Sequence, residues 1–191
     1  MNWRMKEVVM TVILSVACGV IYLGWSTLWI PVSAIVGPVG ANFMFGVAYI
    51  IRKPGAALIA ETAAAAVELL TGSHFGLSSL LIGVFQGAGA EIAFAMFRYQ
   101  RYNLFTLMLS GALAAVGSMT YSLIANGFGY YTTEKLVLTF IIQVISGIIL
   151  GGWLAKAVVG ALAKTGVLDQ YEIMKEQRKK DESNEFVSRM Q

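Results

Sequence analysis

Two glutamates interrupt an otherwise apolar stretch, GAALIAETAAAAVELLTG, that runs from Gly55 to Gly72. Glu61 and Glu68 are seven positions apart, so in a helix they lie about 10 Å apart along the axis and project from nearly the same face. A carboxyl group at bilayer depth is costly, and such residues turn toward a cavity, a partner or a ligand. The alanines between them keep the helix narrow, which lets neighbouring helices pack closely. We therefore interpret this stretch as one wall of a ligand site.

The composition predicts an all-α integral membrane protein. The chain has 191 residues, of which 57% are hydrophobic and only 13% are charged, a balance typical of membrane proteins. Six apolar stretches are each long enough to cross a hydrocarbon core of about 30 Å. We expect a six-transmembrane-helix bundle over residues 1–166 and a charged cytoplasmic tail over residues 167–191. The expected helices are residues 8–30, 34–51, 55–72, 77–97, 104–125 and 136–163.

The distribution of positive charge predicts the orientation of this bundle. The N-terminal segment, the turn RKPG, the loop that follows Phe97 and the tail each carry at least two Lys or Arg residues, whereas the other three connections together carry only Lys135. By the positive-inside rule, both termini lie in the cytoplasm and the loops GSHFG and NGFGYYTTEK lie outside. Membrane topology therefore explains the net charge of +3 better than a nucleic-acid partner does.

Polar and aromatic residues gather in the half of the bundle that we expect to face outside, at a rise of about 1.5 Å per residue. This pattern predicts an outward-facing pocket in which Glu68 is the main contact to a cationic or hydrogen-bond-donating ligand. Each member also has a structural alternative: the aromatics can form an interfacial belt, the amides can join helices, His74 can be a surface loop residue, and Glu61 and Glu91 can have structural roles near the cytoplasm. The candidate binding residues are Trp25, Trp29, Asn42, Glu61, Glu68, His74, Gln86, Tyr121 and Gln143.

Several kinds of chemistry are excluded by the residue inventory. One histidine and one cysteine, Cys18, cannot build a multi-histidine or cysteine metal centre. The segment GALAKT lacks the glycine that precedes the lysine of a phosphate loop, and no nucleophile has an evident base, so we expect neither a cofactor nor an enzyme. The GxxxG spacings predict close helix packing instead. They are Gly83 with Gly87 and Gly147 with Gly151.

Four runs in this order, GVIYLGWSTLW, GPVGANFMFG, RKPGAALIAE and VELLTGSHFG, resemble the YkoE-type substrate-binding (S) components of energy-coupling factor (ECF) vitamin transporters. The resemblance implies a six-helix subunit of the bacterial plasma membrane that captures thiamine or a related hydroxymethylpyrimidine compound from outside. It also implies a transmembrane coupling protein and two cytoplasmic ATPases as partners. The AxxxA docking pair of such subunits is replaced here by Ser15 and Gly19.

Thiamine suits the candidate residues, because it joins a cationic thiazolium ring to an aminopyrimidine. Trp25 and Trp29 can stack on a ring, and Glu68 can balance the charge. Two other classes of protein stay open from the sequence. One is a proton-coupled secondary carrier that uses Glu61 and Glu91, and the other is a structural or assembly membrane protein whose polar groups only join helices.

Overall fold

The computed structural model describes residues 3–17, 20, 45–72, 76–127, 132–166 and 168, and every structural statement below concerns these residues. All regular structure among them is helical, which confirms the predicted all-α class. Residues 5–17 form an N-terminal helix. It is followed by α2 (Phe45–Ile51), α3 (Ala56–Leu70), α4 (Leu77–Met96), α5 (Leu104–Asn126), α6 (Thr133–Ser146), the π-helix η2 (Gly147–Leu154) and α7 (Ala155–Lys164).

The helix ends follow local sequence signals. Helices α4 and α5 begin at the predicted residues. The Asn103 side chain caps α5, because its Oδ1 accepts a hydrogen bond from the Thr106 backbone N–H at 2.9 Å. Helix α6 begins at Thr133, three residues before the predicted start, and Glu134 in its first turn interacts favourably with the helix dipole. Most of the two helices predicted over residues 8–30 and 34–51 lies outside the described residues.

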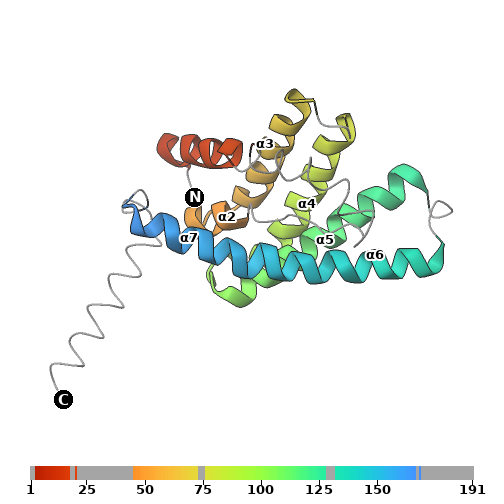
Figure 1. Ribbon diagram of the computed structural model, residues 1–191. Coiled ribbons are helices and arrows are strands. Elements are labelled where there is room, and N and C mark those ends of the chain that lie inside the picture. Colours follow the sequence, from red (N-terminus) through yellow and green to blue (C-terminus); the bar gives the residue numbers. More distant parts are fainter. Residues whose placement is uncertain are drawn as a thin grey trace, which may run out of the picture.

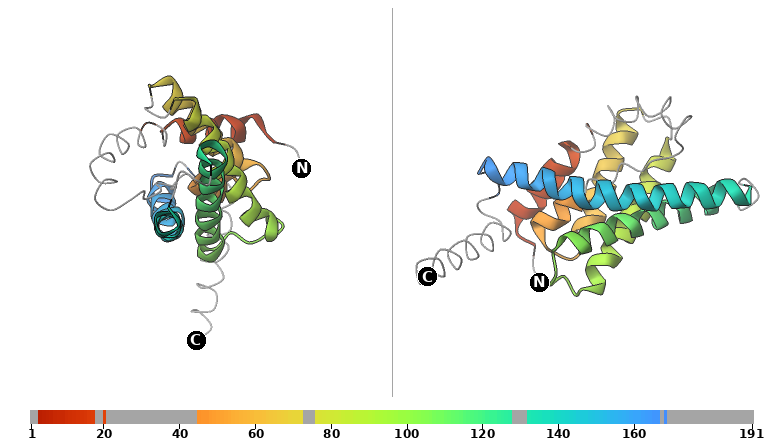
Figure 2. Two further views of the ribbon diagram at one scale, coloured as in Figure 1. Left: turned by 90° about the vertical axis from the view of Figure 1, so that its right-hand side faces the viewer. Right: turned by 60° about the horizontal axis from the view of Figure 1, so that its bottom comes forward.

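Three helices are long and apolar enough to cross a membrane among the residues described. They are α4, α5 and the continuous helix Thr133–Lys164, which joins α6, η2 and α7 over 32 residues. Figure 1 shows this last helix as one long rod beside α5, with α3 and α4 inclined to it. In the end-on view of Figure 2 (left), α5 and α6 lie side by side, as their contacts require. The arrangement is that of a membrane helix bundle.

Glycines bring the backbones of these helices into direct contact. A Cβ atom at Gly89 of α4 would overlap the Leu113 carbonyl of α5, and one at Gly111 of α5 would overlap the Gly147 carbonyl of η2. A Cβ atom at Gly87 would lie 2.9 Å from the Cα atom of Leu58 in α3. The predicted packing role of the GxxxG glycines is therefore confirmed. We call the α4–α5 and α5–η2 contacts the glycine seams.

The π-helix η2 was not predicted. Its eight residues, Gly147–Leu154, have i→i+5 hydrogen bonding within a stretch that is otherwise α-helical. Gly147 and Gly152 of η2 lie against Gly111 and Met108 of α5. At Gly147 the two backbones are in direct contact, and at Gly152 the Met108 side chain packs against the η2 backbone. The wider turn therefore coincides with a close contact between the two helices.

A buried hydrophobic cluster lies at the end of the bundle where α2 meets the start of α3. Helices α4, α5 and α7 contribute Phe94, Leu107 and Val159, all nearly inaccessible to solvent. The positive-inside rule predicts that this end faces the cytoplasm. The same end contains the polar network described next, so the base of the glutamate-bearing helix α3 is held from several sides.

Candidate functional site

Glu61 lies in the interior of the bundle. Its side chain is only 4% exposed, and its Oε1 atom is buried without a hydrogen-bond partner in the described part of the chain. Helix α4 contacts it through glycines, since a Cβ atom at Gly87 would lie 3.1 Å from the Glu61 Cβ atom. The predicted interior position of Glu61 is confirmed, whereas the relation of this face to lipid stays a prediction. A buried polar atom without a partner is costly and points to a role beyond packing.

Glu68 lies two turns further along α3, close to the end of the helix at Leu70. Its side chain is half-buried, unlike that of Glu61. The two carboxyl groups on one helix face therefore differ in their access to solvent. A charge is much less costly at the more exposed position.

Three other candidate residues lie on α4, α5 and α6. Gln86 is half-buried in α4, at the point where Gly117 of α5 lies against the α4 backbone. The Tyr121 ring packs against the Phe85 ring with centroids 5.7 Å apart. The structure thus brings Gln86 and Tyr121 to the α4–α5 interface.

Gln143 lies on α6, the helix that flanks α5 on another side. Its Oε1 atom is buried and, like that of Glu61, has no hydrogen-bond partner among the described residues. Trp25, Trp29, Asn42 and His74 lie outside these residues. The joint participation of all nine candidates in one pocket stays a prediction.

Glu91 has a role that the sequence did not specify. Helix α3 begins after Gly55, which has no side chain to cap the helix, and the Glu91 carboxylate of α4 supplies the missing acceptors. It accepts hydrogen bonds from the backbone N–H groups of Gly55 at 2.5 Å and Ala57 at 3.1 Å, and from the Tyr99 hydroxyl at 2.8 Å. We call this arrangement the Glu91 cap. Burial and the hydrogen bond to Glu91 raise the pKa of Tyr99 to about 12, so the hydroxyl keeps the proton that it donates.

The α2–α3 turn is also held by aromatic rings. The Arg52 guanidinium lies 5.5 Å from the centroid of the Tyr49 ring and 5.1 Å from that of Tyr102. The Tyr102 ring in turn stacks on Phe94 at 5.5 Å. These cation–π contacts hold the Arg52 side chain in place in the turn that precedes α3.

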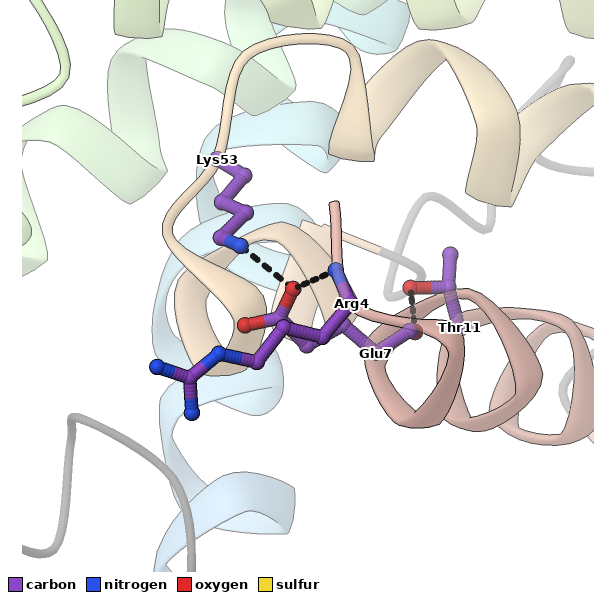
Figure 3. A network of polar contacts seen from close by, with 4 residues as sticks. All are labelled: Arg4, Glu7, Thr11 and Lys53. Carbon is purple, nitrogen blue, oxygen red and sulfur yellow. Dashed lines mark hydrogen bonds and ion pairs between the residues drawn. The ribbon is translucent and has the colours of Figure 1, made fainter. Parts of the chain in front are cut away.

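An ion pair joins the turn to the N-terminal helix (Figure 3). The Lys53 ammonium contacts the Glu7 carboxylate, which also accepts a hydrogen bond from the Arg4 backbone N–H at 2.7 Å. Although burial raises the pKa of Glu7, the hydrogen bonds from Lys53 and Arg4 outweigh it and lower that pKa below its usual value. The Thr11 hydroxyl donates to the Glu7 carbonyl at 2.7 Å. Helix α3 is therefore anchored at its base while its two glutamates lie further along the bundle.

Comparisons with known proteins agree with this architecture. Residues 6–117 match the family described as "ABC-type cobalt transport system, permease component". The "Putative HMP/thiamine permease protein YkoE" of Bacillus subtilis (strain 168) is 38% identical over 187 residues, which cover 94% of each chain. A solved structure described as "Crystal structure of an S-component of ECF transporter" superposes with a TM-score of 0.87 at 36% identity, over 97% of this chain and 98% of that one.

The fold and these matches first define a class: an integral membrane protein that serves as a transport subunit rather than as an enzyme. Within that class, the chain belongs to the family of YkoE-type S components of ECF transporters. The resemblance noted in the sequence is thereby confirmed.

Proposed function

We propose that this S component captures thiamine or a related hydroxymethylpyrimidine compound at a pocket that faces the outside of the cell. The name of the Bacillus subtilis relative, an HMP/thiamine permease, supports this class of ligand at 38% identity. The structural observation that carries the proposal is the buried, unpartnered Oε1 atom of Glu61 on the inward face of α3. A bound aminopyrimidine would supply the hydrogen-bond donor that this atom lacks.

We further propose a six-helix membrane domain over residues 1–166, with both termini and the tail of residues 167–191 in the cytoplasm of a bacterial cell. Import would be driven by ATP through a transmembrane coupling protein and two ATPase subunits. The sequence supports this division of labour, since no stretch of it has the glycine and lysine pattern of a phosphate loop.

Each candidate residue has a proposed role in this pocket. Glu68 would balance the thiazolium charge, because its half-buried carboxyl can remain ionised at less cost than that of Glu61. The indoles of Trp25 and Trp29 would stack on a ring. The amides of Asn42, Gln86 and Gln143 would form hydrogen bonds with the pyrimidine edge. His74 and Tyr121 would lie at the outer rim of the pocket.

The Glu91 cap favours an S component over a proton-coupled carrier. A carboxylate that relays protons must change its hydrogen bonds, whereas Glu91 already accepts from two backbone N–H groups and a tyrosine hydroxyl.

Cobalt, which appears in the description of the matching family, is a poorer ligand for this chain. The single histidine and single cysteine provide few of the nitrogen and sulfur ligands that such a metal prefers.

Binding to the purified full-length chain tests the proposal. Thiamine at micromolar concentration should quench the fluorescence of the four tryptophans and raise the melting temperature, since a ligand that binds only the folded state stabilises it. Cobalt chloride serves as the comparison and should do neither. If thiamine and hydroxymethylpyrimidine both leave fluorescence and melting temperature unchanged, the proposed ligand class is wrong.

A further inference from the structure

The surroundings of Glu61 determine what its carboxyl group can do. Ala57 and Ala64, one turn to either side of it on the same face, are fully buried, and α4 meets it with Gly83 and Gly87. No hydrogen bond or ion pair to the Glu61 side chain is present in the described part of the chain. Among the described residues, the group is therefore packed against small residues that offer it neither a donor nor a charge.

The titratable groups on the packed helices do not supply a counter-charge. Helix α3 carries Glu68, α4 carries Glu91, and α2 carries only Tyr49. The cations of the adjoining turn, Arg52 and Lys53, lie against the tyrosine rings and Glu7 at the base of the bundle.

An unpaired carboxylate in a membrane interior costs several kcal/mol more than the neutral acid, which has only hydrogen bonds to satisfy. The neutral acid also has different chemistry, because it offers one O–H donor and one carbonyl acceptor side by side, whereas a carboxylate only accepts. Such a pair matches a ring edge on which an amino group adjoins a ring nitrogen.

We infer that Glu61 acts as a neutral acid that forms two hydrogen bonds to the aminopyrimidine edge, and so selects the ring shared by thiamine and hydroxymethylpyrimidine. The inference rests on the proposed function and assigns different tasks to the two glutamates. The Glu61 O–H donates to the ring nitrogen, and its carbonyl accepts from the amino group. Glu68 meets the positive charge that thiamine alone carries. The proton stays on Glu61 throughout, so binding creates no buried charge at that position.

The same substitution at the two positions separates these tasks. Glu61→Gln keeps one donor and one acceptor, and we expect affinity for both ligands within about threefold of the parent. Glu61→Leu removes both groups and should weaken both ligands by tenfold to a hundredfold, on the order of one or two hydrogen bonds. Glu68→Gln should weaken thiamine by at least tenfold and leave hydroxymethylpyrimidine unchanged.

Titration calorimetry on each full-length variant in the same detergent measures these affinities. Glu61→Leu should melt no lower than the parent, because it removes an unpartnered polar atom from the interior, and this checks that the variant is folded. A thiamine analogue with hydrogen in place of the pyrimidine amino group provides a test on the parent chain itself. It should bind at least tenfold more weakly, since its edge offers no donor to the Glu61 carbonyl.

Two results would overturn the inference while the proposed function stands. If Glu61→Gln weakens binding as much as Glu61→Leu does, Glu61 acts as a carboxylate. If Glu61→Leu binds both ligands as tightly as the parent chain does, and the parent chain binds the deaminated analogue as tightly as thiamine, Glu61 does not contact the ring. If the parent chain binds neither ligand, the proposed function fails together with the inference.

Discussion

Replacing Glu91 by alanine should destabilise the bundle strongly, because one carboxylate holds the start of α3 to α4 and to the loop that follows. The change removes three hydrogen bonds, from Gly55, Ala57 and Tyr99. A hydrogen bond to a charged group contributes about 1.5–3 kcal/mol, but water can replace part of this at the half-buried Gly55. Ala57 is fully buried. Its N–H would be left without an acceptor, so we expect a total loss of about 3–5 kcal/mol.

Reversible unfolding in mixed micelles of increasing SDS content, followed by tryptophan fluorescence, measures the free energy of unfolding. Glu91→Gln retains one acceptor and should cost about half as much as Glu91→Ala, whereas Tyr99→Phe removes a single bond and should cost about 1 kcal/mol. This order is the test. The Glu91 cap does not stabilise α3 if the free energy of unfolding of Glu91→Ala lies within about 0.5 kcal/mol of that of the parent. The same conclusion follows if Tyr99→Phe lowers the free energy of unfolding more than Glu91→Ala does.

Three further outcomes are expected. Gly111→Ala should lower the free energy of unfolding by about 2–4 kcal/mol, because its methyl group would overlap a backbone carbonyl that cannot move aside; a variant as stable as the parent would contradict the close contact. In a Cys18→Ala background, Asn126→Cys should react with an impermeant thiol reagent in intact cells and Gln100→Cys should not, and the reverse pattern would invert the topology. The purified chain alone should hydrolyse no ATP and accumulate no thiamine in liposomes, and concentrative uptake by the lone chain would favour a secondary carrier.

Much of the fold could be predicted from the sequence, since local signals determine it. Apolar length defined α4 and α5, and the Asn103 cap marks where α5 begins. The GxxxG spacings indicated close packing. Because a carboxyl group is costly in lipid, the sequence predicted that Glu61 points into the bundle. The low exposure of Glu61 agrees with that prediction.

Features that depend on a second helix could not be predicted. The π-helix η2 arises where Gly147 meets Gly111, and nothing in either segment alone indicates their contact. The sequence predicts that Glu91 lies toward the cytoplasm, but its contact with α3 depends on that helix lacking a cap of its own. Within the site, the sequence singled out Glu68 as the main contact, and the structure shows that Glu61 is the more enclosed of the two glutamates.

The glycine seams have a mechanical consequence. Helices that meet through side chains can slide by changing rotamers, but α4, α5 and η2 meet at Gly89, Gly111 and Gly147 with backbone against backbone. No side chain can rearrange at these three contacts, so displacement there would break the contact outright. Helix α3 also meets α4 with backbone against backbone, since a Cβ atom at Gly87 would lie 2.9 Å from the Leu58 Cα atom. Helices α3, α4, α5 and η2 should therefore behave as a single stiff plate. Any motion that opens or empties the site must occur by hinging the remaining helices against this plate.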